Sequence, residues 1–481
     1  MQLEQTLQHY FGYETFRPGQ KEIIEKLIAG QDVVAILPTG MGKSLCYQLP
    51  GYIFNKPVLI ISPLLSLMQD QVDQLKQMGE KRVVALNSFL SVQQKNYALH
   101  FLQEYRFIFI SPEMLIQPQV KEKLSTMELS LIVADEAHCI SQWGYDFRPD
   151  YLRIGEVISN TNRPPILALS ATATDEVLKD ITGYLQMKDW FTYIHSVNRA
   201  NIHLVKKHFS QKEDKLTWIV EHVKRSVGPG IIYTQSRSKA ETISSLLLQQ
   251  NIAVAAYHAG KDMQDRQFIQ QQFLSGQLEW IVATNAFGMG VHKNNVRQVI
   301  HEMMPSTISN YMQEIGRAGR DGKSAVAILL YCEGDEQYAK FIVTEDLPKE
   351  SQIARYMEYV KRGEQPNAML SNGEISEVAF RVLHYWLEKE PVENVKQRMQ
   401  KLQLKKYEEV SEMQNLIETS QCMRRQLVAY FGQQLLEEQD NCCSDCGIEL
   451  SQLIHERKDT HQILELTNWQ HRLRQILLGN L

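Results

Sequence analysis

The sequence predicts an α/β protein in which two similar parallel-sheet domains stand in tandem before a mainly helical region. Short runs of Val, Ile and Leu recur between stretches of helix length from Gln31 to Thr174, and the same rhythm restarts at Gly230. Uninterrupted apolar runs of this kind are typical of strands covered on both faces, as in parallel sheets. The runs stop near Phe341, after which amphipathic patterns with Glu, Lys and Gln faces indicate helices.

Each sheet domain is predicted from its own series of strands. The first series comprises 32–38, 58–63, 107–112, 131–138 and 166–174, and a strand-like segment at 192–197 follows it. The second series comprises 230–236, 252–260, 280–290, 296–301 and 325–331. The polar stretch 197–212 lies between the two series, so we expect the domain boundary there.

Composition excludes several classes of protein. The 481 residues are 43% hydrophobic and 22% charged, which is usual for a globular chain long enough for about three domains. No apolar stretch reaches the roughly 18 residues that a bilayer span needs, so we expect an intracellular protein without membrane contact. With a formal charge of −5, nucleic-acid binding would depend on a local patch rather than on bulk charge.

A glycine-rich segment follows the first predicted strand and precedes an apolar helix. Its residues are Pro38, Thr39, Gly40, Met41, Gly42, Lys43 and Ser44. The glycines let backbone N–H groups turn toward one anion, and the helix N-terminus adds positive potential. Lys43 can reach the β and γ phosphates of a nucleotide, and Ser44 can ligate Mg²⁺. Leu37 replaces the first glycine of the strict motif, yet the Lys-Ser pair favours a phosphate site over an ordinary turn.

Two adjacent carboxylates, Asp135 and Glu136, come at the end of another apolar run. Ligands of open α/β sheets bind at the carboxyl ends of the strands. Asp135 can hold Mg²⁺ through water there, while Glu136 orients and deprotonates the attacking water. A solvated loop is the alternative for an isolated acidic pair, and the phosphate segment upstream favours hydrolysis.

Two arginines three residues apart, Arg317 and Arg320, follow Gln313 near the end of the second series. At this spacing we expect them on one face of a helix turn. Planar guanidinium groups suit a transferring γ-phosphate, so Arg320 is predicted to act as an arginine finger across the cleft between the domains, with Arg317 beside it. A surface salt-bridge pair is the alternative, which Gln313 and the glycines of this segment weaken.

Together these motifs resemble the RecQ family of superfamily 2 DNA helicases. The matching segments, in order, are 16–20, 39–44, 135–138, 170–174, 283–290 and 313–322. The resemblance covers about 1–345 closely and 411–446 well. It implies that the two sheet domains are RecA-like, that ATP and Mg²⁺ drive the reaction, and that 170–174 couples hydrolysis to strand movement.

The resemblance also implies roles for residues outside the phosphate chemistry. Tyr13, Arg17 and Gln20 match the adenine-reading motif, in which Gln20 bonds the base edge and an aromatic ring stacks on it. The segment 138–149 is similar to the aromatic-rich loop of the family. Its residues Trp143, Phe147 and Arg148 would offer rings and a cation to unstacked DNA bases; without the family, a packed loop anchor is the simpler interpretation.

Four of the seven cysteines gather near the end of the chain, at Cys422, Cys442, Cys443 and Cys446. Four soft ligands within this distance indicate tetrahedral Zn²⁺, and the family's zinc module matches the same segment. Neighbouring side chains diverge, so adjacent cysteines are difficult to use together. Asp440 could therefore replace Cys442 as the fourth ligand.

The chain departs from the family at two places. Only 35 residues follow Cys446, too few for the winged helix of roughly 100 residues or for a terminal helical domain, so we expect a short form. An insertion at about 364–407 predicts two helices, 376–389 and 392–409, whose basic residues we interpret as a solvated face rather than a DNA contact. The expected domains are 1–200 and 201–345, a helical region 346–450 with the insertion and the zinc module, and a helical tail 451–481.

These features predict an ATP-dependent 3′–5′ DNA helicase that translocates on single strands and unwinds duplex or branched DNA in repair or recombination. The alternatives are an RNA helicase with the same ATP-hydrolysing domains and a zinc-bearing nucleic-acid scaffold whose binding is switched by ATP. Expected partners are single-stranded and forked DNA, with single-strand-binding protein and repair factors as further candidates. We expect a monomer in the cytoplasm, associated with the nucleoid in a bacterium, or in the nucleus of a eukaryote.

Overall fold

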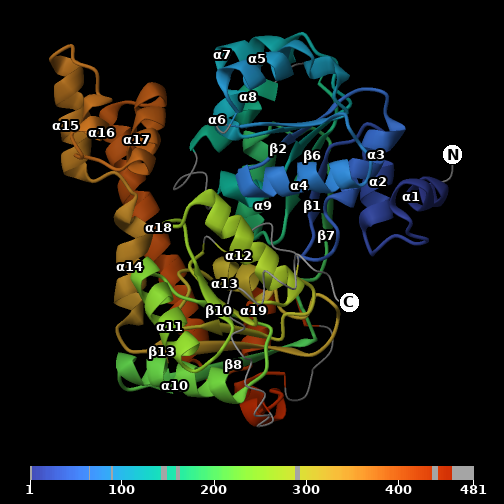
Figure 1. Ribbon diagram of the computed structural model, residues 1–481. Coiled ribbons are helices and arrows are strands. Elements are labelled where there is room, and N and C mark those ends of the chain that lie inside the picture. The colour runs from blue at the N-terminus through green and yellow to red at the C-terminus, as the bar shows by residue number, and fades with distance from the viewer. Residues whose placement is uncertain are drawn as a thin grey trace, which may run out of the picture.

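The computed structural model describes residues 3–63, 65–87, 90–141, 149–158, 163–285, 287, 293–435 and 442–457. It contains two parallel sheets, each with helices on both faces, and a helical region beside them (Figure 1). The predicted fold class is confirmed. Among the described residues, no helix has the length and apolar character that crossing a membrane requires.

The first sheet has the strand order β3-β4-β2-β5-β6-β1-β7, and its paired strands are all parallel. The strands are β1 Val33–Ile36, β2 Val58–Ile61, β3 Val83–Leu86, β4 Phe107–Ile110, β5 Leu131–Ala134, β6 Ile166–Ser170 and β7 Phe191–Ile194. Helices α1 Leu3–Phe11, α2 Gln20–Ile28, α3 Leu45–Ile53 and α4 Leu65–Gln77 accompany them, followed by α5 Val92–His100, α6 Pro112–Leu115, α7 Pro118–Ser125, α8 Ile154–Ile158 and α9 Asp175–Tyr184. Short 3₁₀ turns lie at η1 Leu102–Glu104, η2 Ala137–Ile140 and η3 Pro149–Arg153.

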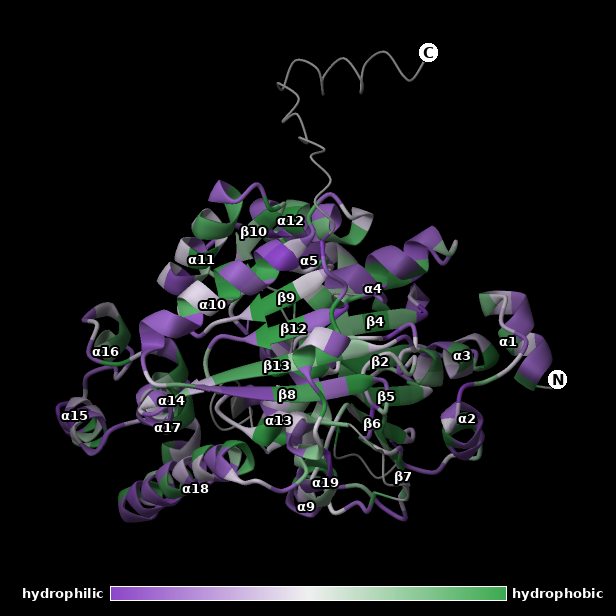
Figure 2. Cartoon of the chain, turned by 90° about the horizontal axis from the view of Figure 1, so that it is seen from below, coloured by the Kyte–Doolittle hydropathy of each residue, from purple (hydrophilic) through white to green (hydrophobic). Residues whose placement is uncertain are grey.

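The second sheet is also parallel and has the order β10-β11-β9-β12-β13-β8. Its strands are β8 Ile202–Phe209, β9 Gly230–Tyr233, β10 Val254–Tyr257, β11 Trp280–Ala283, β12 Gln298–His301 and β13 Ala325–Cys332. The helices between them are α10 Lys212–Arg225, α11 Arg237–Gln249, α12 Met263–Ser275 and α13 Ile308–Ile315. The inner strands of both sheets are apolar, whereas β8 at the edge is largely hydrophilic (Figure 2).

Two strands were not predicted. β3 lies on the edge of the first sheet, and β8 lies within the polar stretch 197–212 that we interpreted as a boundary. The predicted strands form, but several end early; the one expected at 131–138 ends at Ala134. Asp135 and Glu136 therefore lie just beyond the strand.

The helical region begins with α14 Asp335–Glu345 and contains α15 Glu350–Lys361, α16 Ala368–Ser371, α17 Glu377–Lys389, α18 Val392–Glu418 and α19 Met423–Tyr430, with 3₁₀ turns η4 Ser444–Cys446 and η5 Leu450–Gln452. The long helix α18 joins two cores. Its Val395 and Met399 pack in the apolar cluster that includes α15–α17 and one face of the first sheet. Its Val410 and Met413 pack in a cluster with one face of the second sheet.

Basic residues of the insertion are engaged in ion pairs. Lys396 Nζ lies 2.9 Å from Glu393, and Lys405 Nζ lies 2.7 Å from Glu176 in α9 of the first domain. Arg398 bonds Glu390 and also lies over the ring of Trp386. That this helix presents a solvated charged face rather than a DNA contact stays a prediction.

The second domain contains a fully buried ion pair. Lys215 Nζ donates to Asp335 Oδ2 at 2.5 Å and to the carbonyl of Glu302 at 3.0 Å. Asp335 also accepts from the backbone N–H of Cys332 at 3.1 Å. Both side chains are almost completely excluded from solvent, so each charge depends on the other for compensation.

Lys215→Met should lower the free energy of unfolding of the second domain by about 3–5 kcal/mol, because it leaves the Asp335 carboxylate buried without its cation. The measurement is urea unfolding followed by tryptophan fluorescence. Lys215→Met combined with Asp335→Asn should lose less, since neither residue is then charged and Asn can still accept from Cys332. Equal losses in the two variants would contradict this explanation.

Candidate functional site

The phosphate segment forms a tight loop between β1 and α3. Gly40 and Gly42 have φ angles of +91° and +73°, which glycine adopts without the strain that other residues would have. A Cβ at Gly42 would lie 2.7 Å from Nε2 of Gln20, so this position also requires a small residue. Lys43 follows, and its Nζ lies 3.3 Å from Oε1 of Glu136.

Arg17, just before α2, and Gln20, the first residue of α2, contact this loop from outside. Gln20 Nε2 donates to the carbonyls of Met41 at 2.9 Å and Gly42 at 3.1 Å, and its Oε1 accepts from the Arg17 N–H at 2.9 Å. The Arg17 guanidinium donates to the carbonyl of Gly40. Tyr13 is 59% exposed. The structure therefore brings Arg17 and Gln20 to the loop and leaves the Tyr13 side chain largely in solvent.

The acidic pair lies at the carboxyl end of β5. Asp135 continues the sheet by donating its N–H to Ile61 at 2.9 Å, and its own carbonyl accepts from the hydroxyl of Tyr151. Glu136 has a left-handed φ of +48°, an uncommon conformation for a residue with a side chain. The Glu136 N–H also donates to Asp135 Oδ1 at 3.0 Å.

Burial and the neighbouring charges give these carboxylates opposite pKa shifts. Burial, together with the charge of Glu136, raises the pKa of Asp135 to about 7. Burial would also raise the pKa of Glu136, but Lys43, through its charge and its hydrogen bond, and the neighbouring His138 and Arg317 together outweigh burial and lower that pKa below its usual value. Glu136 is thus the carboxylate that remains ionised, as a residue that accepts a proton from water must be.

A serine in the 170–174 segment lies beside the acidic motif. His138 Nδ1 is 2.9 Å from Oγ of Ser170 and 3.5 Å from Oε2 of Glu136, and the Ser170 hydroxyl donates to the Thr172 carbonyl at 2.6 Å. Burial lowers the pKa of His138, so the ring is neutral at neutral pH. A continuous polar path therefore links Glu136 to the end of β6.

The two arginines lie opposite, but not on a helix. Helix α13 ends at Ile315, and Arg317 and Arg320 occupy the turn that follows, so the expected helical placement is wrong. Both line one cleft of about 420 Å³ with residues from the first domain, and Gln313 lines it as well. Burial and the charge of Arg317 lower the pKa of Arg320 to about 9.

This cleft brings together most of the predicted nucleotide-binding and catalytic residues. The ones that line it are Arg17, Thr39, Gly40, Gly42, Lys43, Ser44, Asp135, Glu136, Gln313, Arg317 and Arg320. Tyr47, Leu67, Gln71, Gln74 and Asn294 also line it and were not predicted. They carry no motif, since each becomes a cleft residue only when distant elements pack together.

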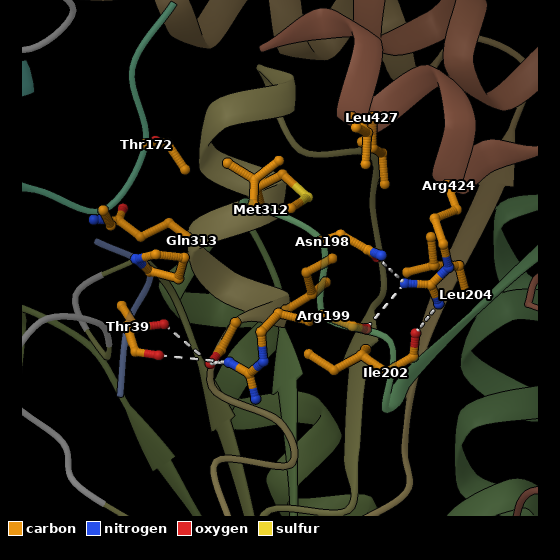
Figure 3. Close-up of a pocket in the computed structure, with 16 residues that line it drawn as sticks. Thr39, Thr172, Asn198, Arg199, Ile202, Leu204, Met312, Gln313, Arg424 and Leu427 are labelled. Carbon is orange, nitrogen blue, oxygen red and sulfur yellow. Dashed lines mark hydrogen bonds between the residues drawn. The ribbon is translucent and has the colours of Figure 1, made fainter. Parts of the chain in front are cut away.

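A second group of residues was missed at the junction of the domains. The Thr39 hydroxyl donates to the carbonyl of Gly316 at 3.0 Å, which joins the phosphate loop to the turn that carries the arginines. Arg199, in the connection between β7 and β8, donates to carbonyls on both sides of this contact. These residues surround an apolar pocket that Arg424 of α19 also lines (Figure 3). A lone arginine in a polar stretch offers no sequence signal.

All four clustered cysteines converge. Their sulfur atoms lie within 4.8 Å of one another, with 3.5 Å between Cys422 and Cys442 and 3.5 Å between Cys443 and Cys446. The expectation that the adjacent pair would diverge is not met, since Cys442 and Cys443 both contribute. Four thiol groups at such separations fit tetrahedral Zn²⁺.

The cysteine cluster is attached to the edge of the second sheet. The backbone of Cys443 forms an isolated parallel β-bridge with Leu204 of β8, and Asp445 forms an ion pair with Lys206 at 3.0 Å.

Other predicted residues lie outside the described part of the chain. These are Trp143, Phe147, Arg148, the alternative ligand Asp440, and 458–481 of the tail.

Comparisons with known proteins agree with this architecture. The DEAD/DEAH box helicase model matches 17–181, the helicase conserved C-terminal domain matches 211–322, and the RecQ zinc-binding model matches 380–448. Among solved structures, Dbp5 of S. cerevisiae bound to RNA and ADP BeF3 superposes with a TM-score of 0.58 at 18% identity, covering 71% of this chain and 90% of that one. The chain is thus a helicase with two RecA-like domains.

Curated relatives narrow the class. The probable ATP-dependent DNA helicase RecS of Bacillus subtilis is 40% identical over 98% of this chain and 97% of its own length. The ATP-dependent DNA helicase RecQ of Haemophilus influenzae is 40% identical over 70% of this chain and 55% of its own. A putative ATP-dependent RNA helicase of Acanthamoeba polyphaga mimivirus is 34% identical over 93% and 72%. The chain belongs to the RecQ family of ATP-dependent DNA helicases.

Metal analysis should find one Zn²⁺ per chain. Cys442→Ser should lose it, because the Cys442 sulfur lies within the cluster. Asp440→Ala is the matched control and should retain zinc. Zinc retained in Cys442→Ser but lost in Asp440→Ala would instead make Asp440 the fourth ligand.

Proposed function

We propose that this chain uses ATP hydrolysis to translocate 3′ to 5′ along single-stranded DNA and to unwind duplex or branched DNA in repair and recombination. One observation carries the proposal. A single cleft is lined by a lysine and two carboxylates from one RecA-like domain and by two arginines from the other. A reaction centre divided in this way can form only when the domains are together, which links chemistry to domain movement.

The phosphate loop is proposed to hold the triphosphate of ATP. Lys43 would place its charge on the β and γ phosphates, and backbone N–H groups of the loop would face the same anion. Mg²⁺, when bound, supplies charge neutralisation at the phosphates. Ser44 and Asp135 are its proposed ligands, and their oxygen atoms in the same cleft suit a hard cation.

Glu136 is proposed to orient the attacking water and accept its proton. Its lowered pKa and its 3.3 Å contact with Lys43 keep it ionised and positioned. Arg320, with Arg317 beside it, would stabilise the charge that develops on the transferred phosphoryl group. Arg317 is buried and lines the same cleft as Lys43 and Glu136, which supports a role toward a ligand.

Adenine recognition and strand movement are assigned to neighbouring segments. Gln20 would bond the base edge with Arg17 beside it, and Tyr13 would stack on the ring. The path from Glu136 through His138 to Ser170 supports transmission of hydrolysis to the segment after β6. Trp143, Phe147 and Arg148 remain the proposed contacts with unstacked bases.

DNA is proposed as the nucleic acid along which the protein translocates, because a relative that matches almost the whole chain is named a probable DNA helicase. One relative is named a putative RNA helicase, so RNA is the second candidate substrate. We further propose a monomer that acts on single-stranded and forked DNA, with single-strand-binding protein as a candidate partner.

Lys43→Ala and Glu136→Gln should each reduce DNA-stimulated ATP hydrolysis by at least about 100-fold, for different reasons. Lys43→Ala removes charge that also binds ATP, so nucleotide affinity should fall. Glu136→Gln removes only the proton acceptor, so it should still bind nucleotide. Hydrolysis rates and equilibrium binding of a fluorescent ATP analogue provide the comparison, and equal loss of affinity in both variants would contradict these roles.

Strand displacement should require ATP and proceed on a DNA duplex with a 3′ single-stranded tail, but not on one with a 5′ tail. Matched RNA duplexes test the second candidate function. Unwinding of RNA alone would replace the DNA assignment. Hydrolysis without displacement of any strand would favour an ATP-switched scaffold.

A further inference from the structure

Arg199 occupies an unusual position between the two domains. Its guanidinium donates to the carbonyls of Gly319 at 2.8 Å, Ala318 at 3.2 Å and Gly316 at 3.4 Å, and to that of Thr39 at 3.5 Å. Every one of these acceptors is a backbone carbonyl. Arg199 therefore binds backbone carbonyls of a turn and of the phosphate loop rather than a single side chain.

The turn that Arg199 contacts is the one that carries the arginines of the cleft. The carbonyls of Gly316, Ala318 and Gly319 lie just beyond the last residue of α13, where no continuing helix supplies N–H donors to them, and a cation near a helix C-terminus is favourable. Five donors in a planar fork let one arginine hold several of these carbonyls together. Arg199 therefore contacts the backbone of the turn that carries Arg317 and Arg320, although its own side chain lines the neighbouring pocket and not the nucleotide cleft.

Glycines in the turn show how closely its neighbours approach. A Cβ at Gly319 would lie 2.4 Å from Nδ2 of Asn201, which donates to the Gly319 carbonyl at 2.8 Å. A Cβ at Gly316 would lie 2.8 Å from Oγ1 of Thr39. The turn is therefore held from the interdomain connection on one side and from the phosphate loop on the other.

Arg199 is itself bound by a second arginine, Arg424. It lies near the start of α19, next to the cysteine cluster, and is only 4% exposed. Its guanidinium donates to the Asn198 side chain at 2.8 Å and to the Arg199 carbonyl at 2.9 Å (Figure 3). It also donates to the carbonyls of Ile202 and, at 3.3 Å, Cys442.

We propose that Arg199 is a positioning residue for the arginine finger Arg320, and that Arg424 fixes Arg199 so that the zinc module supports ATP hydrolysis. The inference rests on the proposed function, because it needs Arg320 to act on the transferred phosphoryl group. Arg199 acts through the turn and touches neither ATP nor water. The zinc module then contributes to the chemical step as well as to the stability of the second domain.

The test is a double-mutant cycle between Arg199→Met and Arg320→Ala, measured in single-turnover hydrolysis of ATP with saturating single-stranded DNA. Arg199→Met should lower the rate constant by about tenfold or more while changing ATP affinity by less than about threefold. In the Arg320→Ala background the same substitution should lower the rate by less than about twofold, since the finger it positions is gone. Arg199→Lys should recover part of the rate, because an ammonium can still donate to some of the carbonyls.

Controls separate positioning from a loss of folding. Zinc content and thermal unfolding should remain near those of the wild type in Arg199→Lys and in Arg424→Gln, and Arg424→Gln should also slow hydrolysis. Arg106→Met is the matched control. Arg106 is a partly buried arginine that donates to the Gly51 carbonyl at 2.6 Å and immediately precedes β4, so it lies at the amino ends of the parallel strands, opposite the carboxyl ends that the cleft adjoins. The Arg106→Met substitution should leave the rate of ATP hydrolysis unchanged.

Each outcome decides between the proposals. Wild-type hydrolysis in Arg320→Ala would remove the finger assignment of the proposed function. A slow Arg320→Ala combined with a normal Arg199→Met would overturn only the positioning role. Losses that multiply in the double variant would overturn it too, as would a rate loss in Arg199→Lys that follows its unfolding temperature.

Discussion

The contact between Thr39 and Gly316 is the interaction on which the assembled cleft depends. Each sheet holds only half of the phosphate chemistry at the carboxyl ends of its strands. The 3.0 Å hydrogen bond joins the phosphate loop directly to the turn beyond α13. It brings Arg317 and Arg320 to the cleft that Asp135 and Glu136 line, where the charge of Arg317 adds to that of Lys43 in lowering the pKa of Glu136.

Local chemistry explains what could be predicted from the sequence. The phosphate loop, the acidic pair and the cysteine cluster each need particular residue types at short spacing. The structure places the loop and the acidic pair in one cleft and the four cysteines in a separate cluster. Inner strands were recognised because burial on both faces requires continuous apolar runs. β8 was missed because an edge strand is partly solvated, so Lys206 and Lys207 are tolerated within it.

The remaining errors arise where a residue's role depends on distant neighbours. Arg199 and Arg424 work through backbone carbonyls, which every residue has, so no pattern of side chains identifies their partners. The helix expected around Arg317 fails for a related reason. Gly316 ends α13, and contacts from Thr39 and Arg199 hold the chain in a turn instead of another helical turn.

The length of α18 has a consequence for how this molecule can move. The helix has 27 residues and spans roughly 40 Å, with one end in the core of the first domain and the insertion and the other in the core of the second. A continuous helix resists stretching, so the domains cannot slide apart along its axis. Rotation about its axis leaves both ends packed, so we expect α18 to act as the pivot when the cleft opens.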